Sequence, residues 1–457
     1  MKPIRPRAAA ALGIVALFLA PSLAGAQTVA PNPDVLVVGG TPAGIAAAIT
    51  AARDGETVTL VSAKNDLGGT LTDAMMDQWD LNAAPNGTSL QGGVFAEIYA
   101  RLGDVFTPQS AARSLAEMVA DEPRITVRYD DVAVRAETAA DRDGEKITGV
   151  TFVDTRDGVV DTLHAPFLID ATDSGDVAAL AGARYDVGRQ DTGIDERTQA
   201  VTEVFTLDGI DWAALANSYD EARFGPGGVV GRRAWGYAEL MRDYRPAFAD
   251  VVVRDLNLGL LPDGAVTVNA VDVCGIDGLD QNQLDEAKRQ TEIEAPRLVA
   301  YLRERLAGFE DARVGMFAGD VYVRETRHIE GVERLTAGDV WFGRIPADSI
   351  GLSSYPLDLH PVDPSDEPAY APERHVYGIP FGTLVPKGFT NLLLASPAIS
   401  ASHVASGSAR VIPTTIEEGE ADGHACAIAE KRGENFLELA RQPSAIAIER
   451  PAGRRAA

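Results

Sequence analysis

Short apolar runs separated by turn residues open the globular part of the chain. Residues 34–38 (Asp-Val-Leu-Val-Val) and 57–61 (Thr-Val-Thr-Leu-Val) are apolar and β-branched, which predicts two short buried strands. The alanine-rich residues 45–53 between them predict a helix, and Asp54-Gly55 ends it because glycine is a natural C-terminal cap. These elements form a β-α-β unit within about thirty residues, which indicates a parallel sheet.

The apolar pattern changes to a period of two between residues 125 and 172. Four stretches follow this period, and turn signals at 141–144 and 155–158 separate the last three. The stretches are residues 125–129, 132–136, 146–154 and 159–163. We interpret them as an antiparallel meander inserted into a parallel-sheet protein, after which residues 167–170 return as a short apolar strand.

The chain beyond residue 186 is less regular. Residues 284–306 predict a long helix with a charged and an apolar side, residues 391–395 a last core strand, and residues 415–431 a last helix. Residues 358–374 are rich in Pro, Asp and Glu, which predicts a surface loop. The segment after Asn435 is expected to fray.

The first 26 residues follow the plan of a secretory signal. A basic start without acids precedes the apolar residues 8–19, and Ala24-Gly25-Ala26 has the small-residue spacing of a cleavage site. The apolar run is shorter than the roughly 20 residues that span a bilayer, so we expect cleavage after Ala26 rather than a retained anchor. The predicted location is therefore periplasmic or secreted.

Charge and cysteine content narrow the possible partners. The chain has 41 Lys and Arg against 67 Asp and Glu, a net charge of −26. Such a surface repels nucleic acid and anionic lipid, so we expect neither nucleic acid nor, after signal cleavage, a membrane as partner. Cys274 and Cys426 are too few for an iron–sulfur or zinc site, and no metal ligands are predicted. Two buried free thiols are favoured over a disulfide, and the oligomeric state stays open.

The turn Gly39-Gly40-Thr41-Pro42-Ala43-Gly44 carries the main chemical signal. Gly39 permits a tight turn, and Gly44 lets the following helix pack closely on the strand. The N-terminus of that helix then presents free N–H groups to a diphosphate. Thr41 stands where the dinucleotide pattern has its second glycine. The alternative is a glycine-rich turn that holds no ligand.

The end of the second strand is where an acid normally binds the adenosine ribose. Ser62 stands there and offers a single hydroxyl. Asn65 or Asp66 of the following loop are alternative ribose ligands. Lys64 leaves open a nucleotide with an added phosphate, such as NADP.

With residues 67–71 (Leu-Gly-Gly-Thr-Leu), this region resembles the amino end of the FAD-dependent oxidoreductase family, which is related to the flavoprotein subunits of fumarate reductase and heterodisulfide reductase. Further similar blocks follow in the family's order, at residues 169–182, 322–329, 354–360, 379–388 and 391–414. The resemblance implies FAD as cofactor. The predicted cofactor-binding residues are Gly39, Gly40, Thr41, Ala43, Gly44, Ser62, Gly68, Gly69, Thr70, Ala171, Thr172, Pro413 and Thr414.

The resemblance also implies a fold class and a domain order. The fold class is α/β: an FAD/NAD(P)-binding Rossmann-type domain with a parallel sheet and an antiparallel meander, interrupted by an α+β substrate domain. The FAD-binding domain covers residues 33–185 and returns at 376–435. The substrate or cap domain covers 186–375, and a flexible tail covers 436–457.

The last predicted helix and a few basic side chains are candidates for catalysis. Residues 414–417 (Thr-Thr-Ile-Glu) have the pattern of a capping box, and the resemblance implies that this helix end faces the flavin. Histidines pass protons near neutral pH and arginines bind carboxylates. His403 and Arg410 are the preferred pair because they flank the expected flavin-facing turn, and His360 and Arg324 are further candidates.

The sequence thus predicts an exported FAD-dependent oxidoreductase that transfers hydride between flavin and a small organic substrate. One alternative is a dinucleotide- or ligand-binding protein without redox chemistry, which the departures at Thr41, Ser62, Asp173 and Ser396 favour. The family often has glycine at the third of these positions and Gly-Arg at the fourth. Another alternative is a flavin electron-transfer partner of a second protein.

Overall fold

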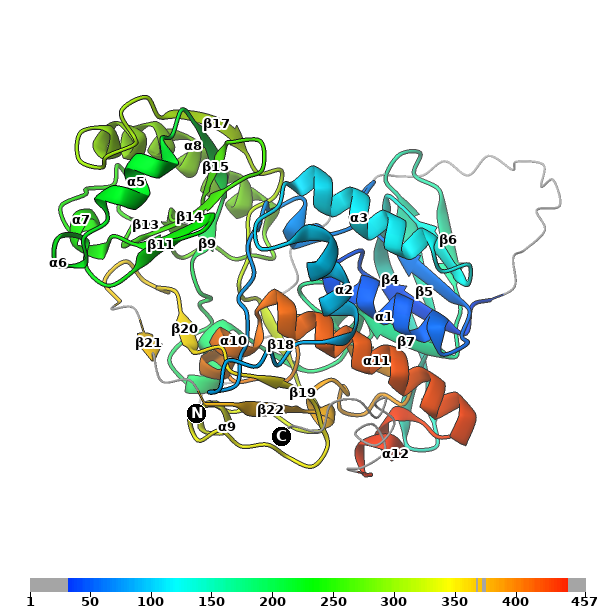
Figure 1. Ribbon diagram of the computed structural model, residues 1–457. Helices are drawn as coiled ribbons and strands as arrows, with labels where there is room; N and C mark the ends of the chain where they lie inside the picture. Colours follow the sequence, from blue (N-terminus) through cyan, green and yellow to red (C-terminus); the bar gives the residue numbers. More distant parts are fainter. Residues whose placement is uncertain (1–31, 367–368, 372–374, 443–457) are drawn as a thin grey trace, which may run out of the picture. The chain divides into compact units, whose positions relative to one another are not determined.

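The computed structural model describes residues 32–366, 369–371 and 375–442 (Figure 1). The predicted signal peptide and the tail beyond residue 442 lie outside these residues. The described residues from Pro33 onward form a single compact unit. Among the helices of the described residues, none has the length and apolar character that a membrane crossing requires.

A five-stranded parallel sheet carries the glycine turn. Its strand order is β23-β7-β1-β2-β3, and every neighbouring pair is parallel. Its strands are β1 (Val35–Val38), β2 (Val58–Val61), β3 (Ile125–Arg128), β7 (Phe167–Asp170) and β23 (Leu392–Leu394). All residues of β1, β2 and β23 are buried, which explains their continuous apolar runs. The predicted α/β class with a parallel sheet is confirmed.

The predicted meander forms, but with one strand fewer. Strands β4 (Asp131–Asp141), β5 (Gly144–Asp154) and β6 (Val160–Leu163) make a three-stranded antiparallel sheet. The expectation that residues 125–129 belong to this meander is wrong, because they form β3 at the edge of the parallel sheet. Helix α3 (Pro108–Ala120) supplies the crossover that returns the chain parallel to β2.

Helices α1 (Pro42–Arg53) and α11 (Ile412–Arg432) run side by side, so the first and last parts of the chain share one core (Figure 1). Two glycines of α11 make this approach possible. A Cβ atom on Gly419 would stand 2.0 Å from the carbonyl oxygen of Ala43, and one on Gly423 would stand 2.7 Å from that of Ala47. Since α1 begins at the glycine turn, this packing positions the site.

We expect Gly419→Ala to lower the free energy of unfolding by about 2–3 kcal/mol, because the added methyl group meets backbone rather than a movable side chain. Chemical denaturation measures the change. Gly338→Ala in α9 (Ala337–Trp341) is the matched control, since its nearest neighbour would be 3.7 Å away. The control should be neutral or slightly stabilising. Equal effects of the two substitutions would contradict this account of the packing.

A second sheet and a second hydrophobic core lie in the middle of the sequence. The six-stranded antiparallel sheet has the order β11-β12-β14-β15-β10-β17. Its strands are β10 (Phe205–Asp208), β11 (Gly228–Val230), β12 (Arg233–Gly236), β14 (Leu256–Leu260), β15 (Val266–Val268) and β17 (Arg313–Phe317). Helix α8 (Gln281–Arg303) packs beside β17 and is amphipathic, as the sequence predicts. This core draws on residues between Val201 and Val321, whereas the core of the parallel sheet draws on both flanking segments. The exact domain boundaries stay a prediction.

Short elements complete the described chain. The helices are α2 (Gly93–Leu102), α4 (Asp176–Leu180), α5 (Trp212–Ser218), α6 (Glu221–Phe224), α7 (Ala238–Met241), α10 (His403–Ala409) and α12 (Phe436–Ala440), with 3₁₀ turns Gly69–Leu71, Gly188–Thr192 and Phe381–Thr383. The strands are β8 (Tyr185–Val187), β9 (Val201–Thr202), β13 (Val251–Val252), β16 (Asp272–Val273), β18 (Arg327–Ile329), β19 (Ser349–Ser353), β20 (Leu357–Leu359), β21 (Ala369–Ala371) and β22 (Tyr377–Pro380).

The C-terminal region differs from expectation in three places. The predicted loop 358–374 contains β20, which pairs with β21. Helix α12 forms within the segment expected to fray, because Asn435 caps it and Phe436 packs on Phe167 with ring centroids 5.3 Å apart. The capping box at Thr414 is wrong, since α11 begins earlier, at Ile412, and its N-cap residue has no side-chain bond.

The two cysteines are free and buried, as the sequence favoured.

Candidate functional site

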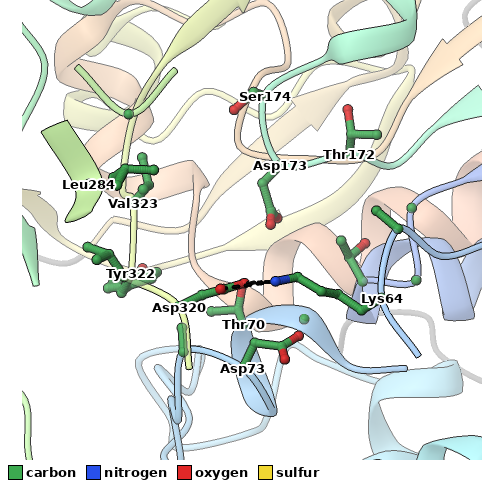
Figure 2. A pocket seen from close by; sticks show the side chains of 18 of the residues that line it. Lys64, Thr70, Asp73, Thr172, Asp173, Ser174, Leu284, Asp320, Tyr322 and Val323 are labelled. Carbon is green, nitrogen blue, oxygen red and sulfur yellow. Dashed lines mark hydrogen bonds and ion pairs between the residues drawn. The ribbon is translucent and has the colours of Figure 1, made fainter. Parts of the chain in front are cut away.

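A cavity of about 390 Å³ opens where the parallel strands end, and we call it the nucleotide cavity (Figure 2). Residues that follow three strands line it: Gly39 after β1, Ser62 after β2 and Thr172 after β7. The carboxyl ends of parallel strands are where nucleotides bind in such folds. The volume lies within the range of small-molecule and cofactor sites.

The glycine turn is shaped by backbone contacts that no side chain could replace. Gly39 has φ +126°, and a Cβ atom there would stand 2.3 Å from the carbonyl oxygen of Ala171. A Cβ atom on Gly44 would stand 2.0 Å from the carbonyl oxygen of Gly39. Thr41 caps the helix by accepting from the Gly44 N–H at 3.1 Å and donates to the Ala171 carbonyl at 2.9 Å. Gly44 and Ala171 thus build the turn and line neither cavity that we describe in this site.

The turn also has backbone N–H donors without an acceptor among the described residues, and these show whether an anion would fit here. The backbone N–H groups of Gly40, Thr41 and Ala43 have no acceptor within the described part of the chain. They lie at the N-terminus of α1, where the helix dipole favours negative charge. This donor set fits the diphosphate of a dinucleotide.

Carboxylates surround the same cavity and oppose a diphosphate. Lys64 reaches across to Asp320, with its Nζ 2.8 Å from the Asp320 carboxylate, and Asp73 and Asp173 point toward this ion pair (Figure 2). Burial opposes the charge of Lys64, but the ion pair with Asp320 raises its pKa. Removal from bulk water and the neighbouring acids raise the pKa of Asp73 and of Asp173 to about 6. Burial also raises the pKa of Asp66.

Of the other predicted cofactor-binding residues, some line the nucleotide cavity and some shape the loops around it. The Ser62 hydroxyl donates to the Asp66 carbonyl at 2.9 Å and accepts from the Lys64 N–H at 3.2 Å, so its own loop uses it. Gly69 and Thr70 line the cavity, whereas Gly68, with φ +123°, shapes the turn before them. A ribose role for Ser62 stays a prediction, and Asp66 beside it lines the cavity with a buried oxygen that lacks a donor among the described residues.

A smaller inner cavity adjoins the first and shares Thr41, Thr70, Asp173, Tyr322 and Val323 with it. Its other lining residues are Pro42, Ala43, Arg324, Ala395, Ser396, Pro397, Arg410, Ile412 and Thr415. The first turn of α11 therefore reaches it. Pro413 and Thr414 of the same turn are buried but do not line it, and Thr414 bonds instead to Asn82 at 3.5 Å.

Three of the four predicted catalytic residues are connected through two aspartates. The His360 Nδ1 lies 2.9 Å from Asp272, whose other oxygen lies 3.5 Å from Arg324. The His360 Nε2 lies 4.0 Å from Asp358, which in turn lies 3.8 Å from Arg410. We call these five residues the arginine–histidine chain. Burial opposes the charge of Asp272, but His360 and Arg324 outweigh it and lower its pKa to about 2.

The two arginines of this chain keep unused donors beside the inner cavity. Arg324 and Arg410 are almost fully buried, and the Nε of each has no acceptor among the residues that the structure describes. Arg410 donates to the Tyr322 hydroxyl at 2.9 Å, and the Arg324 guanidinium lies 4.9 Å from the Tyr322 ring centroid. The arrangement can bind a carbonyl, hydroxyl or carboxylate group and can exchange a proton at His360.

His403, the fourth predicted catalytic residue, lies in a separate buried cluster. Its Nδ1 and the Nε2 of His328 each lie 2.8 Å from the same oxygen of Glu325. Burial opposes the charge of Glu325, but the two histidines outweigh it and lower its pKa to about 2. His403 lines neither the nucleotide cavity nor the inner cavity. Its catalytic role stays a prediction.

Several lining residues were not identified from the sequence. Asp320 and Tyr322 border the similar block at 322–329, and that adjacency was a usable signal. Gln281, Leu284 and Lys288 come from α8, far along the chain, and have no local motif. Asp272 is likewise visible only once the fold brings it to His360, whereas Asp358 stands two residues before His360 in the similar block 354–360.

The βαβ unit, the glycine turn and the cavity at the strand ends define a Rossmann-type dinucleotide-binding protein. The family model described as FAD dependent oxidoreductase matches residues 34–446. The chain therefore belongs to the FAD-dependent oxidoreductase family, and the resemblance, the fold class and FAD as cofactor are confirmed. The protein is an FAD-dependent oxidoreductase.

The chain is similar to several solved structures at low identity and with TM-scores below 0.5. A geranylgeranyl bacteriochlorophyll reductase-like protein from Thermoplasma acidophilum is 12% identical, with a TM-score of 0.45, over 91% of this chain and 83% of that one. The flavin-dependent brominase Bmp2 is 10% identical, with a TM-score of 0.46, over 90% and 82%. The p-nitrophenol 4-monooxygenase PnpA from Pseudomonas putida is 15% identical, with a TM-score of 0.38, over 66% and 70%. No curated protein matches the chain significantly.

Proposed function

We propose that this oxidoreductase is exported and exchanges hydride with a small polar organic substrate bound at the arginine–histidine chain. The observation that carries the proposal is the pair of unused arginine donors beside a histidine that two aspartates hold in place. A hydroxyl-, carbonyl- or carboxylate-bearing molecule matches these donors. Flavin accepts or gives up hydride when bound.

The side chains would divide the remaining work between binding and proton transfer. Arg324 and Arg410 would orient the polar groups of the substrate. Asp272 accepts from the His360 Nδ1 and so fixes the orientation of the imidazole ring. The His360 Nε2, with only a distant carboxylate at 4.0 Å, is then the atom that passes a proton to or from a substrate hydroxyl.

We expect His360→Asn to slow reduction of the bound flavin by about 10²–10⁴-fold, the usual contribution of a general acid–base residue. FAD affinity should not change, since His360 does not line the nucleotide cavity. The measurement is anaerobic bleaching of the FAD-loaded protein by hydroxy acids, sugars and sugar acids. His164→Asn, which removes an exposed histidine bonded to the Thr148 carbonyl, is the control.

Two results would count against the proposal. Unchanged bleaching in His360→Asn would remove the proton-transfer role. A loaded protein that no small molecule bleaches, but that a partner redox protein reduces, would favour the electron-transfer alternative.

Export has its own experiment, because its support is the basic and apolar pattern of the first 26 residues. The full chain is expressed in a Gram-negative host, and the N-terminus of the product is sequenced in each cell fraction. We expect a periplasmic product that begins at Gln27. An uncleaved cytoplasmic product would contradict export.

A further inference from the structure

Three carboxyl groups meet at the edge of the fold opposite to the cofactor cavities. Asp34 immediately precedes β1, Glu56 stands two residues before β2, and Glu430 lies in the last turn of α11. One oxygen of each lies within 4.8 Å of the others. We propose that Asp34, Glu56 and Glu430 bind a divalent cation, with Ca²⁺ preferred.

The buried member of the cluster points to a ligand. Glu56 is only 5% exposed, and its Oε2 has no donor among the described residues. A buried carboxylate oxygen without a partner costs free energy unless a proton or a cation satisfies it.

Among the described residues, no positive side chain neutralises the cluster, because no Lys, Arg or His forms an ion pair with Asp34, Glu56 or Glu430. The nearby His424 bonds to Asp54 instead. Glu430 also stands at the C-terminal end of a long helix, where the dipole disfavours an acid and favours a cation.

The cluster is fixed in position at Asp34 and open to solvent at Glu430. Asp34 is held by the N–H and the hydroxyl of Thr57, which bond to its Oδ2 at 2.8 and 2.6 Å. Glu430 is exposed, so water can complete the coordination shell. Ca²⁺ binds oxygen at about 2.3–2.6 Å, so ligands on its opposite sides can stand about 5 Å apart. Mg²⁺ requires a tighter octahedron at about 2.1 Å.

The cation would join the start of the first two parallel strands to the end of α11. This bond would supplement the α1–α11 contact at Gly419 and Gly423. The expected affinity is that of a partly exposed site with three carboxylates, a Kd on the order of 10⁻⁴–10⁻³ M.

The test is calorimetric titration of the chelator-treated full protein with CaCl₂ at pH 8. We expect one ion per chain, a weaker response to MgCl₂, and a rise in Tm of about 1–3 °C at 10 mM CaCl₂. Glu430→Gln, an exposed substitution that should fold, is expected to weaken Ca²⁺ binding at least tenfold. Glu117→Gln in α3 removes the same charge from an exposed helix and should bind like the wild type.

The competing occupant is a proton shared between Glu56 and Glu430. It predicts no heat with CaCl₂ and a Tm that falls as the pH rises from 6 to 9, and that result would overturn the proposal. Calcium binding that survives both Glu430→Gln and Glu56→Gln would also overturn it, by placing the ion elsewhere, for example at the carboxylates of the nucleotide cavity.

Discussion

Asp173→Asn should tighten the binding of FAD about tenfold at pH 8 and leave it nearly unchanged at pH 5. Asp173 lines both cavities beside the free amides that fit the diphosphate. At pH 8 its carboxylate repels that diphosphate. The unscreened repulsion at short range would be a few kcal/mol, and water in the open cavity reduces it to about 1–2 kcal/mol. Asparagine keeps the shape and removes the charge.

The sign of the pH effect follows from the raised pKa values. Asp73 and Asp173 both have a pKa of about 6, so most of each is protonated at pH 5 and ionised at pH 8. The diphosphate favours the protonated forms, and FAD binding therefore takes up protons in this window. Wild-type affinity falls as the pH rises from 5 to 8, and Asp173→Asn should make that fall shallower.

Quenching of FAD fluorescence on titration with the apoprotein measures Kd at each pH. Asp157→Asn, which removes the same charge from the exposed turn between β5 and β6, is the control for net charge. Lys64→Met should act in the opposite direction, because it removes the cation that balances Asp320. If Asp173→Asn binds FAD no better than the control at pH 8, the diphosphate does not sit beside this carboxylate.

The sequence was informative where a structural requirement is local. The turn at Gly39 follows from a positive φ and a 2.3 Å approach to backbone, and only glycine meets both conditions. The buried strands could be predicted because both faces of a parallel sheet are covered, which leaves continuous apolar runs. Residues 125–128 were misplaced because a strand's partner depends on the preceding crossover helix and not on its own alternation.

The chemistry around the inner cavity could not be predicted for a related reason. His360 was a candidate by type alone, and its role depends on Asp272 of β16, which is 88 positions away in the sequence and bonds to the His360 Nδ1. Similarly, the ion pair between Lys64 and Asp320 joins residues 256 positions apart. Such pairs have no spacing rule in one sequence.

The last prediction concerns two acids on the buried side of α11. Glu418 and Asp422 are one helical turn apart, both are 0% exposed, and none of their four carboxylate oxygens has a hydrogen-bond donor in the described structure. Burial raises the pKa of each well above its usual range, and a neighbouring carboxyl group adds to the effect. Burial therefore favours the protonated, neutral form of both groups in the folded protein.

Glu418→Gln and Asp422→Asn should each raise the free energy of unfolding at pH 7. The unfolded chain ionises these groups above about pH 4, whereas burial favours their protonated forms in the folded chain, so the wild type loses stability as the pH rises through this range. Wild-type stability from these groups is thus complete below about pH 4 and is lost as the pH rises. The amides cannot ionise and should flatten the decline.

Urea denaturation from pH 5 to pH 8 gives the slope directly, with Glu117→Gln as the exposed control. An unchanged slope in both variants would mean that the carboxyl groups are ionised and satisfied by ions or water. The expected result bears on the flavin as well. Glu418 lies near Ser396, which lines the inner cavity, and the first turn of the same helix reaches that cavity. While Glu418 stays protonated, the positive end of the α11 dipole would act at this cavity without a buried negative charge behind it. It would then favour negative charge on a reduced cofactor bound there.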